Sequence, residues 1–259
     1  MKRTLYIITI LLAGMAVLYA CTKNTLKVPY NYVDGQSQVK FNIASAYKAN
    51  PAIQIKINDQ RISPAISYPY PYPGGGLNTN GGSTPDYFSV AAGSIKVSIA
   101  VPKAGSNEDS VALYTTNVSV DANKYFTVHV ADTGANTQTV LVPEDVASPD
   151  SGYSKYKFVN LMPNLAAIDL YFGTTLVAAN VPYKGVSATF TLVSTSGAQW
   201  IIRPAGAAAG STPITTYPTG TTLNVVPNQR VLTVFARGYN GIAGTTDIRR
   251  PQVSLFFNR

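Results

Sequence analysis

Apolar and polar residues alternate in short runs through most of the chain, and glycine, proline, asparagine and serine separate these runs. Alternation with a period of two is typical of strands that bury one face. Residues 53–57 read Ile-Gln-Ile-Lys-Ile, and residues 126–130 read Phe-Thr-Val-His-Val. The pattern predicts an all-β protein built from short strands and many turns.

The runs follow a similar order in the two halves of the chain. Residues 40–43 (Lys-Phe-Asn-Ile), for example, are echoed by residues 157–160 (Lys-Phe-Val-Asn). Each half holds about seven short strands in roughly 105 residues, which is the size of an immunoglobulin-like domain. We therefore expect two tandem immunoglobulin-like antiparallel β-sandwich domains. The expected divisions are residues 39–143 for the first sandwich, 144–152 for a linker and 153–259 for the second.

The second half resembles a known family, the domain of unknown function 4397 (DUF4397), which is common in Bacteroidetes lipoproteins. The resemblance is carried by Lys157-Phe158-Val159-Asn160 with Pro163, by Ile168-Asp169-Leu170-Tyr171 and by Val231-Leu232-Thr233-Val234. The first half matches loosely and departs most at residues 68–83, an insertion without a counterpart in the second half. The resemblance implies an immunoglobulin-type sandwich at a cell-envelope address, and it implies no catalytic residue.

The N-terminus follows a different pattern, in which two basic residues precede an apolar segment from Leu5 to Ala20. This segment is shorter than the roughly 20 apolar residues of a spanning helix. Cys21, the only cysteine of the sequence, follows it directly. Because residues 18–21 resemble a lipobox, we expect a lipoprotein signal peptide over residues 1–20 and lipidation of Cys21. The alternatives are an ordinary thiol after a secretion signal and an uncleaved anchor.

The segment after Cys21 predicts a lipidated tether. Residues 21–38 are mostly polar, contain Pro29 and Gly35, and show no sustained period. Several acyl chains on the N-terminal cysteine anchor a protein stably to a membrane. The expected location is therefore the bacterial cell envelope, at the outer membrane, with its periplasmic and surface faces both left open.

The distribution of charge argues against a nucleic-acid partner. The formal net charge is +8, but the basic residues are scattered along the chain. Nucleic-acid binding requires basic residues clustered on one face. We therefore expect a membrane and an envelope protein or glycan as partners, and no nucleic acid.

No residue pattern predicts catalysis, a metal site or a cofactor. The single histidine, His129, stands in an alternating strand, where a surface imidazole is expected. Glu144 and Asp145 are expected to be solvated loop acids, although two acids that meet across the fold remain an alternative. Trp200 is expected in a core rather than on a ligand platform. We expect a protein that is not an enzyme.

One segment is a candidate for recognition. Residues 67–83 contain Tyr68, Tyr70 and Tyr72 in alternation with prolines. Polyproline II geometry would turn these rings outward, where they offer flat faces to a sugar or a protein; the alternative is packing onto the sandwich. Two functions follow. The first is a non-enzymatic envelope lipoprotein that binds or supports a protein, as an accessory of an outer-membrane complex. The second is a carbohydrate-binding or adhesin lipoprotein that uses this loop.

Overall fold

The computed structural model describes residues 34–44, 51–79, 81–82, 84–106, 108–244 and 246–259. Their regular structure is β-strand, apart from the short 3-10 helix η1 (Gly134–Asn136). The predicted all-β fold is therefore confirmed. In these ranges no helix is long and apolar enough to cross a membrane.

The predictions for the N-terminus lie outside the described residues. They are the signal peptide at residues 1–20, Cys21 and most of the tether. The described chain begins with Asp34, and strand β1 begins at Gln36. Residues 36–38, which were predicted as the end of the tether, are part of a sheet, because their backbone pairs with residues 89–91.

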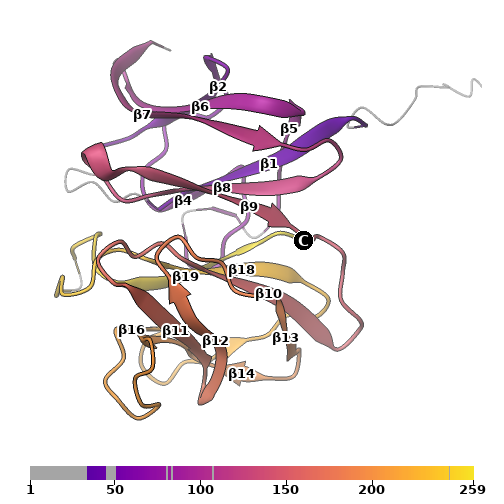
Figure 1. Ribbon diagram of the computed structural model, residues 1–259, viewed down its shortest axis with the longest axis vertical. Coiled ribbons are helices and arrows are strands. Elements are labelled where there is room, and N and C mark those ends of the chain that lie inside the picture. Colours follow the sequence, from indigo (N-terminus) through magenta and orange to yellow (C-terminus); the bar gives the residue numbers. More distant parts are fainter. Residues whose placement is uncertain (1–33, 45–50, 80, 83, 107, 245) are drawn as a thin grey trace, which may run out of the picture. The chain divides into compact units, whose positions relative to one another are not determined.

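Strands β1 to β9 form a sandwich of two sheets (Figure 1). One sheet has the order β4-β1-β8-β9, with β5 also paired to β1, and the other has the order β3-β2-β6-β7. The strands of the first sheet are β1 (Gln36–Ile43), β4 (Tyr70–Tyr72), β5 (Phe88–Ala91), β8 (Tyr125–Ala131) and β9 (Gln138–Glu144). Those of the second sheet are β2 (Gln54–Ile57), β3 (Gln60–Arg61), β6 (Gly93–Pro102) and β7 (Asp109–Val120).

The alternation in β1 decides which of its side chains enter the first core. Val39, Phe41 and Ile43 are buried in a cluster between the two sheets. Ile55 on β2 and Val97 on β6 approach the same cluster from the facing sheet. Full burial of an aliphatic or aromatic side chain stabilises the fold by about 1.5–3 kcal/mol. The one-sided burial that the sequence predicted is what holds this sandwich together.

Strands β10 to β19 form the second sandwich (Figure 1). Its sheets have the orders β13-β10-β18-β19 and β12-β11-β15-β16, with a two-stranded sheet β14-β17 beside them. The strands of the first of these sheets are β10 (Tyr153–Asn160), β13 (Phe190–Val193), β18 (Val231–Arg237) and β19 (Gln252–Phe257). The others are β11 (Ala167–Phe172), β12 (Thr175–Pro182), β14 (Gly197–Ala198), β15 (Trp200–Pro204), β16 (Thr215–Tyr217) and β17 (Asn224–Val225).

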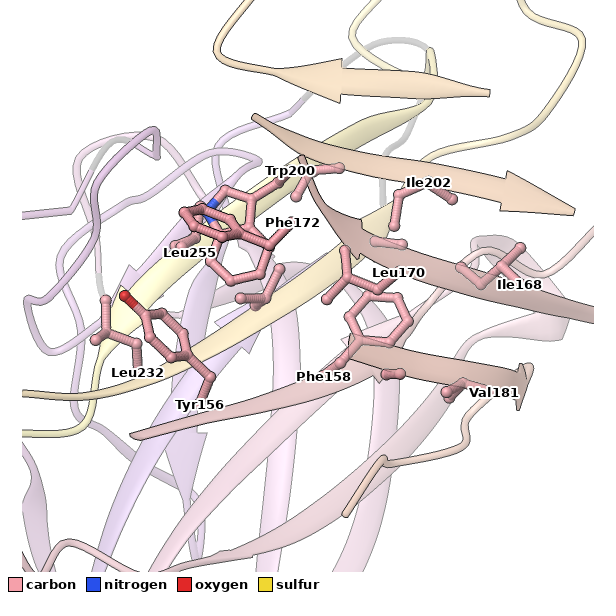
Figure 2. Close-up of a cluster of buried hydrophobic side chains, with 14 of the residues drawn as sticks. Tyr156, Phe158, Ile168, Leu170, Phe172, Val181, Trp200, Ile202, Leu232 and Leu255 are labelled. Atoms are coloured by element: carbon pink, nitrogen blue, oxygen red, sulfur yellow. The ribbon is translucent and has the colours of Figure 1, made fainter. Parts of the chain in front are cut away.

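Trp200 on β15 lies at the centre of the second core (Figure 2). Its side chain is fully buried, and its ring centroid is 4.7 Å from that of Phe172 and 5.2 Å from that of Tyr156. The indole Nε1 donates a hydrogen bond of 3.1 Å to Asn224 Oδ1. The prediction that Trp200 is a core residue is confirmed.

One ladder in each sandwich differs from the predicted antiparallel pattern. β1 runs parallel to β8, and β10 runs parallel to β18, whereas the other ladders are antiparallel. In both sandwiches the first strand thus lies beside the next-to-last strand. Parallel neighbours need a long connection, and the strands between the two partners in sequence supply it.

A third apolar cluster joins the two sandwiches, and the described residues belong to one compact unit. Its buried members are Ala44, Ala131 and Val142 from the first sandwich and Val159, Leu161, Phe235 and Phe256 from the second. The sheets that contain β1 and β10 are therefore covered on both faces. Almost every residue of β8 and β18 is buried for this reason.

Candidate functional site between the two sandwiches

Polar side chains share the buried contact between the sandwiches. We call this contact the seam; it is formed by the outer faces of β1, β8 and β9 against β10, β18 and β19. Lys40 and Lys157 take corresponding positions in the parallel ladders. Lys40 Nζ donates a hydrogen bond across the seam to the carbonyl oxygen of Phe257. In the opposite direction, Lys157 Nζ donates a hydrogen bond of 2.5 Å to the carbonyl oxygen of Pro143. Such reciprocal contacts are typical of symmetric dimer interfaces.

Glu144 is the buried acid of the seam, with a side-chain exposure of 1%. Its Oε1 accepts hydrogen bonds from Thr127 at 2.9 Å and Thr233 at 3.4 Å, and its Oε2 lies 3.2 Å from Lys157 Nζ. Burial raises the pKa of Glu144, while the charge of Lys157 acts in the opposite direction. The prediction of a solvated loop acid is wrong here, because β9 extends to this residue and the second sandwich covers it.

His129 also lies in the seam and is fully buried. Asn42 Nδ2 stands 2.9 Å from the Nδ1 of His129, and the imidazole packs 5.8 Å from the Phe256 ring and 6.3 Å from the Phe235 ring. Burial, together with the smaller effect of the Lys157 charge, lowers the pKa of His129 to about 3. The prediction of a surface imidazole is wrong, because the second sandwich covers this face of β8.

The tyrosines of the segment 67–83 do not form an exposed platform. Tyr68 is 4% exposed, and its hydroxyl accepts a hydrogen bond from Arg237, whose guanidinium lies 4.9 Å from the ring centroid. Tyr70 and Tyr72 lie on β4, which pairs with β1, and both pack against the first core. Of the two alternatives that the sequence left open, packing onto the sandwich describes these three tyrosines.

Residues 77 and 78 of this insertion bind the second sandwich. Leu77 donates a backbone hydrogen bond of 3.0 Å to Leu255 on β19. The side chain of Asn78 accepts from the backbone of Leu255 at 3.0 Å and donates to that of Val253 at 2.5 Å. Since β19 is the edge strand of its sheet, these contacts cover that edge. We call residues 68–78 the clasp.

A groove opens where the seam meets solvent, with a volume of about 570 Å³. Its lining comes from within residues 121–126, at the entry to β8, from residues 143–147 and from Lys157. The volume falls in the range of small-ligand sites, roughly 300–1,000 Å³. Two of the lining residues, Glu144 and Lys157, belong to the seam, and Lys157 is the contribution of the second sandwich to this lining.

The groove combines one aromatic face with exposed polar groups. Tyr125 is 36% exposed, and its ring meets the ring of Tyr87 edge-on at 5.1 Å. Asp145 Oδ2 accepts a hydrogen bond of 2.6 Å from Lys155 Nζ, which lowers the pKa of Asp145. An aromatic ring beside carboxylate, amide and ammonium groups suits a sugar or a peptide. Sequence reasoning missed this groove; the available signal was Tyr125, an aromatic residue outside the alternating apolar positions of its strand.

Two further features bear on chemistry. Among the described residues, no group of three or more His, Cys, Asp or Glu side chains is placed to hold a metal ion. A second hollow of about 540 Å³ lies at residues 102–106 beside Arg61 and Ala65, and no aromatic residue lines it. The groove beside the seam is therefore the stronger candidate for ligand contact.

The comparisons with known proteins bear on the family. The family model "Domain of unknown function (DUF4397)" matches residues 37–171, from β1 to β11. Among solved structures, the chain is similar to the crystal structure of CBMbc, a family CBM26 module from Eubacterium rectale Amy13K in complex with maltoheptaose. That match has 12% sequence identity and a TM-score of 0.24, and it covers 83% of this chain and 95% of that chain. The search of curated proteins finds no match. Because the family model spans more than half of the sequence, the chain belongs to the DUF4397 family.

Proposed function

We propose that this chain is a non-enzymatic, lipid-anchored module of the bacterial cell envelope, at the outer membrane, which presents the groove to an envelope protein. The seam is the observation that carries the proposal. Reciprocal lysine contacts and the clasp join the two sandwiches, and the groove is formed at their junction. The apolar segment before Cys21 supports the anchor. The protein serves as a binding or structural accessory, of a type found among Bacteroidetes lipoproteins.

We also infer that the two sandwiches are tandem copies of one domain. Their parallel ladders occupy the same place in the strand order. Lys40 and Lys157 occupy corresponding positions and make corresponding contacts. Burial of equivalent faces against each other is how two copies of one domain form a closed pair.

Replacing Cys21 with serine should release the protein from membranes. A serine accepts no thioether-linked diacylglycerol, so the acyl chains that hold the protein are lost. Membrane and soluble fractions, separated from the same cells and probed for the protein, measure the effect. The wild-type chain should stay with the membrane at high salt. A Cys21→Ser chain that also stays there would contradict the lipid anchor.

The groove also favours a second candidate function, the binding of a glycan. Tyr125 offers an exposed ring beside Asp145 and Asn123, the combination that stacks on a sugar face and bonds its hydroxyl groups. In this candidate function the carbohydrate site is the groove, whereas the sequence predicted it at Tyr68, Tyr70 and Tyr72.

Replacing Tyr125 with alanine should weaken ligand binding about tenfold, which corresponds to roughly 1.4 kcal/mol. Titration of envelope polysaccharides, and co-purification of proteins from native membranes, measure the two candidate functions separately. The matched control is Tyr153→Ala, since Tyr153 is 45% exposed and does not line the groove. Equal loss of binding in both variants would contradict a role for the groove.

A further inference from the structure

Lys40 is a buried amine in unusual surroundings. Its side chain has no exposed surface, and Nζ contacts the carbonyl oxygen of Phe257 at the end of β19. The amine also lies 4.8 Å from the ring centroid of Tyr87 and 5.4 Å from that of Phe256. The peptide group that it contacts is the one that leads into Asn258. An amine from the first strand of the first sandwich thus meets the end of the last strand of the second.

Asn258 is buried beside this amine, with an exposure of 3%. Its Nδ2 donates a hydrogen bond of 2.9 Å to Thr233 Oγ1, and its Oδ1 accepts one of 3.4 Å from the Tyr87 hydroxyl. The backbone of Asn258 is fixed by a hydrogen bond of 2.7 Å to Val231. The carboxamide is therefore held in place, with a hydroxyl donor on its oxygen.

The corresponding pair on the other side of the seam supports the approach of the two groups. Val142 pairs with Thr127 in the β8–β9 ladder, and Phe256 pairs with Thr233 in the β18–β19 ladder. Glu144 comes two residues after Val142, and Asn258 comes two residues after Phe256. Asn258 therefore takes the position that Glu144 takes in the first sandwich. There the lysine that corresponds to Lys40 reaches the side chain: Lys157 Nζ lies 3.2 Å from the Glu144 carboxylate. The Asn258 carboxamide therefore has the same place relative to Lys40 in strand position as the Glu144 carboxylate has relative to Lys157.

We propose that Lys40 and Asn258 form an intramolecular amide cross-link. The lone pair of Lys40 Nζ attacks Cγ of Asn258, so that the Nζ–Cγ bond forms and the Cγ–Nδ2 bond breaks. A proton passes from Nζ to the departing nitrogen, which leaves as ammonia. The reaction needs no oxidant, reductant or co-substrate, and its product is a secondary amide between the two sandwiches.

The seam supplies the groups that this reaction needs. Burial lowers the pKa of Lys40 to about 8, so an appreciable share of the amine is neutral and nucleophilic near neutral pH. Thr233 Oγ1 accepts from Asn258 Nδ2 and donates to Glu144 Oε1 at 3.4 Å. Burial raises the pKa of Glu144, which favours the protonated acid that can deliver a proton through Thr233 to the leaving nitrogen.

Peptide mapping of the full chain, after unfolding and digestion with trypsin, tests the proposal on the wild-type protein. We expect no cleavage after Lys40, and a branched peptide that joins the Lys40 segment to the segment containing Asn258. Its mass should be lower by one ammonia than the sum of the two peptides. Recovery of Lys40 and Asn258 in separate, unlinked peptides would overturn the proposal, whether Asn258 is intact or hydrolysed to aspartate.

Variants distinguish this chemistry from a random linkage. Lys40→Arg and Asn258→Ala should each abolish the branched peptide. Glu144→Gln should slow its formation about hundredfold while both reacting groups remain. The matched control is Lys96→Arg, because Lys96 pairs with the exposed Asp59 on the far sheet of the first sandwich and should leave the cross-link intact. A branched peptide that persists in Lys40→Arg would refute the assignment, and circular dichroism of each variant verifies that it is folded.

Discussion

Replacement of Trp200 by alanine is expected to lower the free energy of unfolding by about 3–5 kcal/mol. The side chain is fully buried, and the rings of Phe172 and Tyr156 pack beside it (Figure 2). The ring centroid of Phe190 lies 6.4 Å from that of Trp200. Alanine leaves a cavity that these rings cannot fill, and it also leaves Asn224 Oδ1 without the indole donor. Since domains are stable by only about 5–15 kcal/mol, the loss is a large part of the total.

Urea unfolding followed by far-UV circular dichroism measures this loss. The matched control is Val225→Ala in the same sandwich, because Val225 is 68% exposed and should change the stability by less than about 0.5 kcal/mol. A Trp200→Ala protein within about 1 kcal/mol of the wild type would mean that the second core does not depend on this ring.

The strands could be predicted because each contributes one face to its own core. In β1, Val39, Phe41 and Ile43 alternate with polar residues and enter the first core as expected. The same rule could not tell what covers the other face. Lys40 and Asn42 look like solvent-facing residues in the sequence, yet both are fully buried in the seam. Local alternation reports which residues share a face, and it does not report which partner covers that face.

The candidate site escaped prediction for the same reason. The partner of Tyr68 could not be predicted, because no local pattern reveals Arg237, which lies in the other sandwich. The β8–β9 ladder brings together the two groove segments around Tyr125 and Asp145, and Lys157 from the second sandwich completes the lining. No local pattern in the sequence reveals that contribution of Lys157. One signal was present. Phe256 and Phe257 are consecutive on β19, so one of the two rings must point away from its own core and requires a cover on the outer face.

Acid should destabilise the wild-type protein through His129 by about 2 kcal/mol between pH 7 and pH 5. In the folded chain burial lowers the pKa of this imidazole to about 3, whereas in the unfolded chain it is near 6.5. As the pH falls below 6.5, the unfolded state binds a proton that the folded state refuses, so the equilibrium shifts toward unfolding. The slope is about 1.4 kcal/mol per pH unit until the folded imidazole also titrates.

The variant His129→Gln isolates this contribution. Glutamine has a similar size and can still accept from Asn42, but it does not titrate. Glu144 acts in the opposite direction, since burial raises its pKa and the folded state then gains protons as the pH falls. Both proteins keep Glu144, Lys40 and Lys157. For each protein the unfolding free energy is measured at pH 7 and at pH 5, and the two changes are compared. The contributions of these three groups then cancel.

His129 is the only histidine of the chain, which leaves no second imidazole to produce such a difference. If the two proteins lose stability in parallel over this range, the imidazole is accessible to protons in the folded state. The seam over β8 would then have to open on the time scale of the experiment. A divergence of about 2 kcal/mol means instead that the sandwiches stay closed on each other while the unfolded chain titrates.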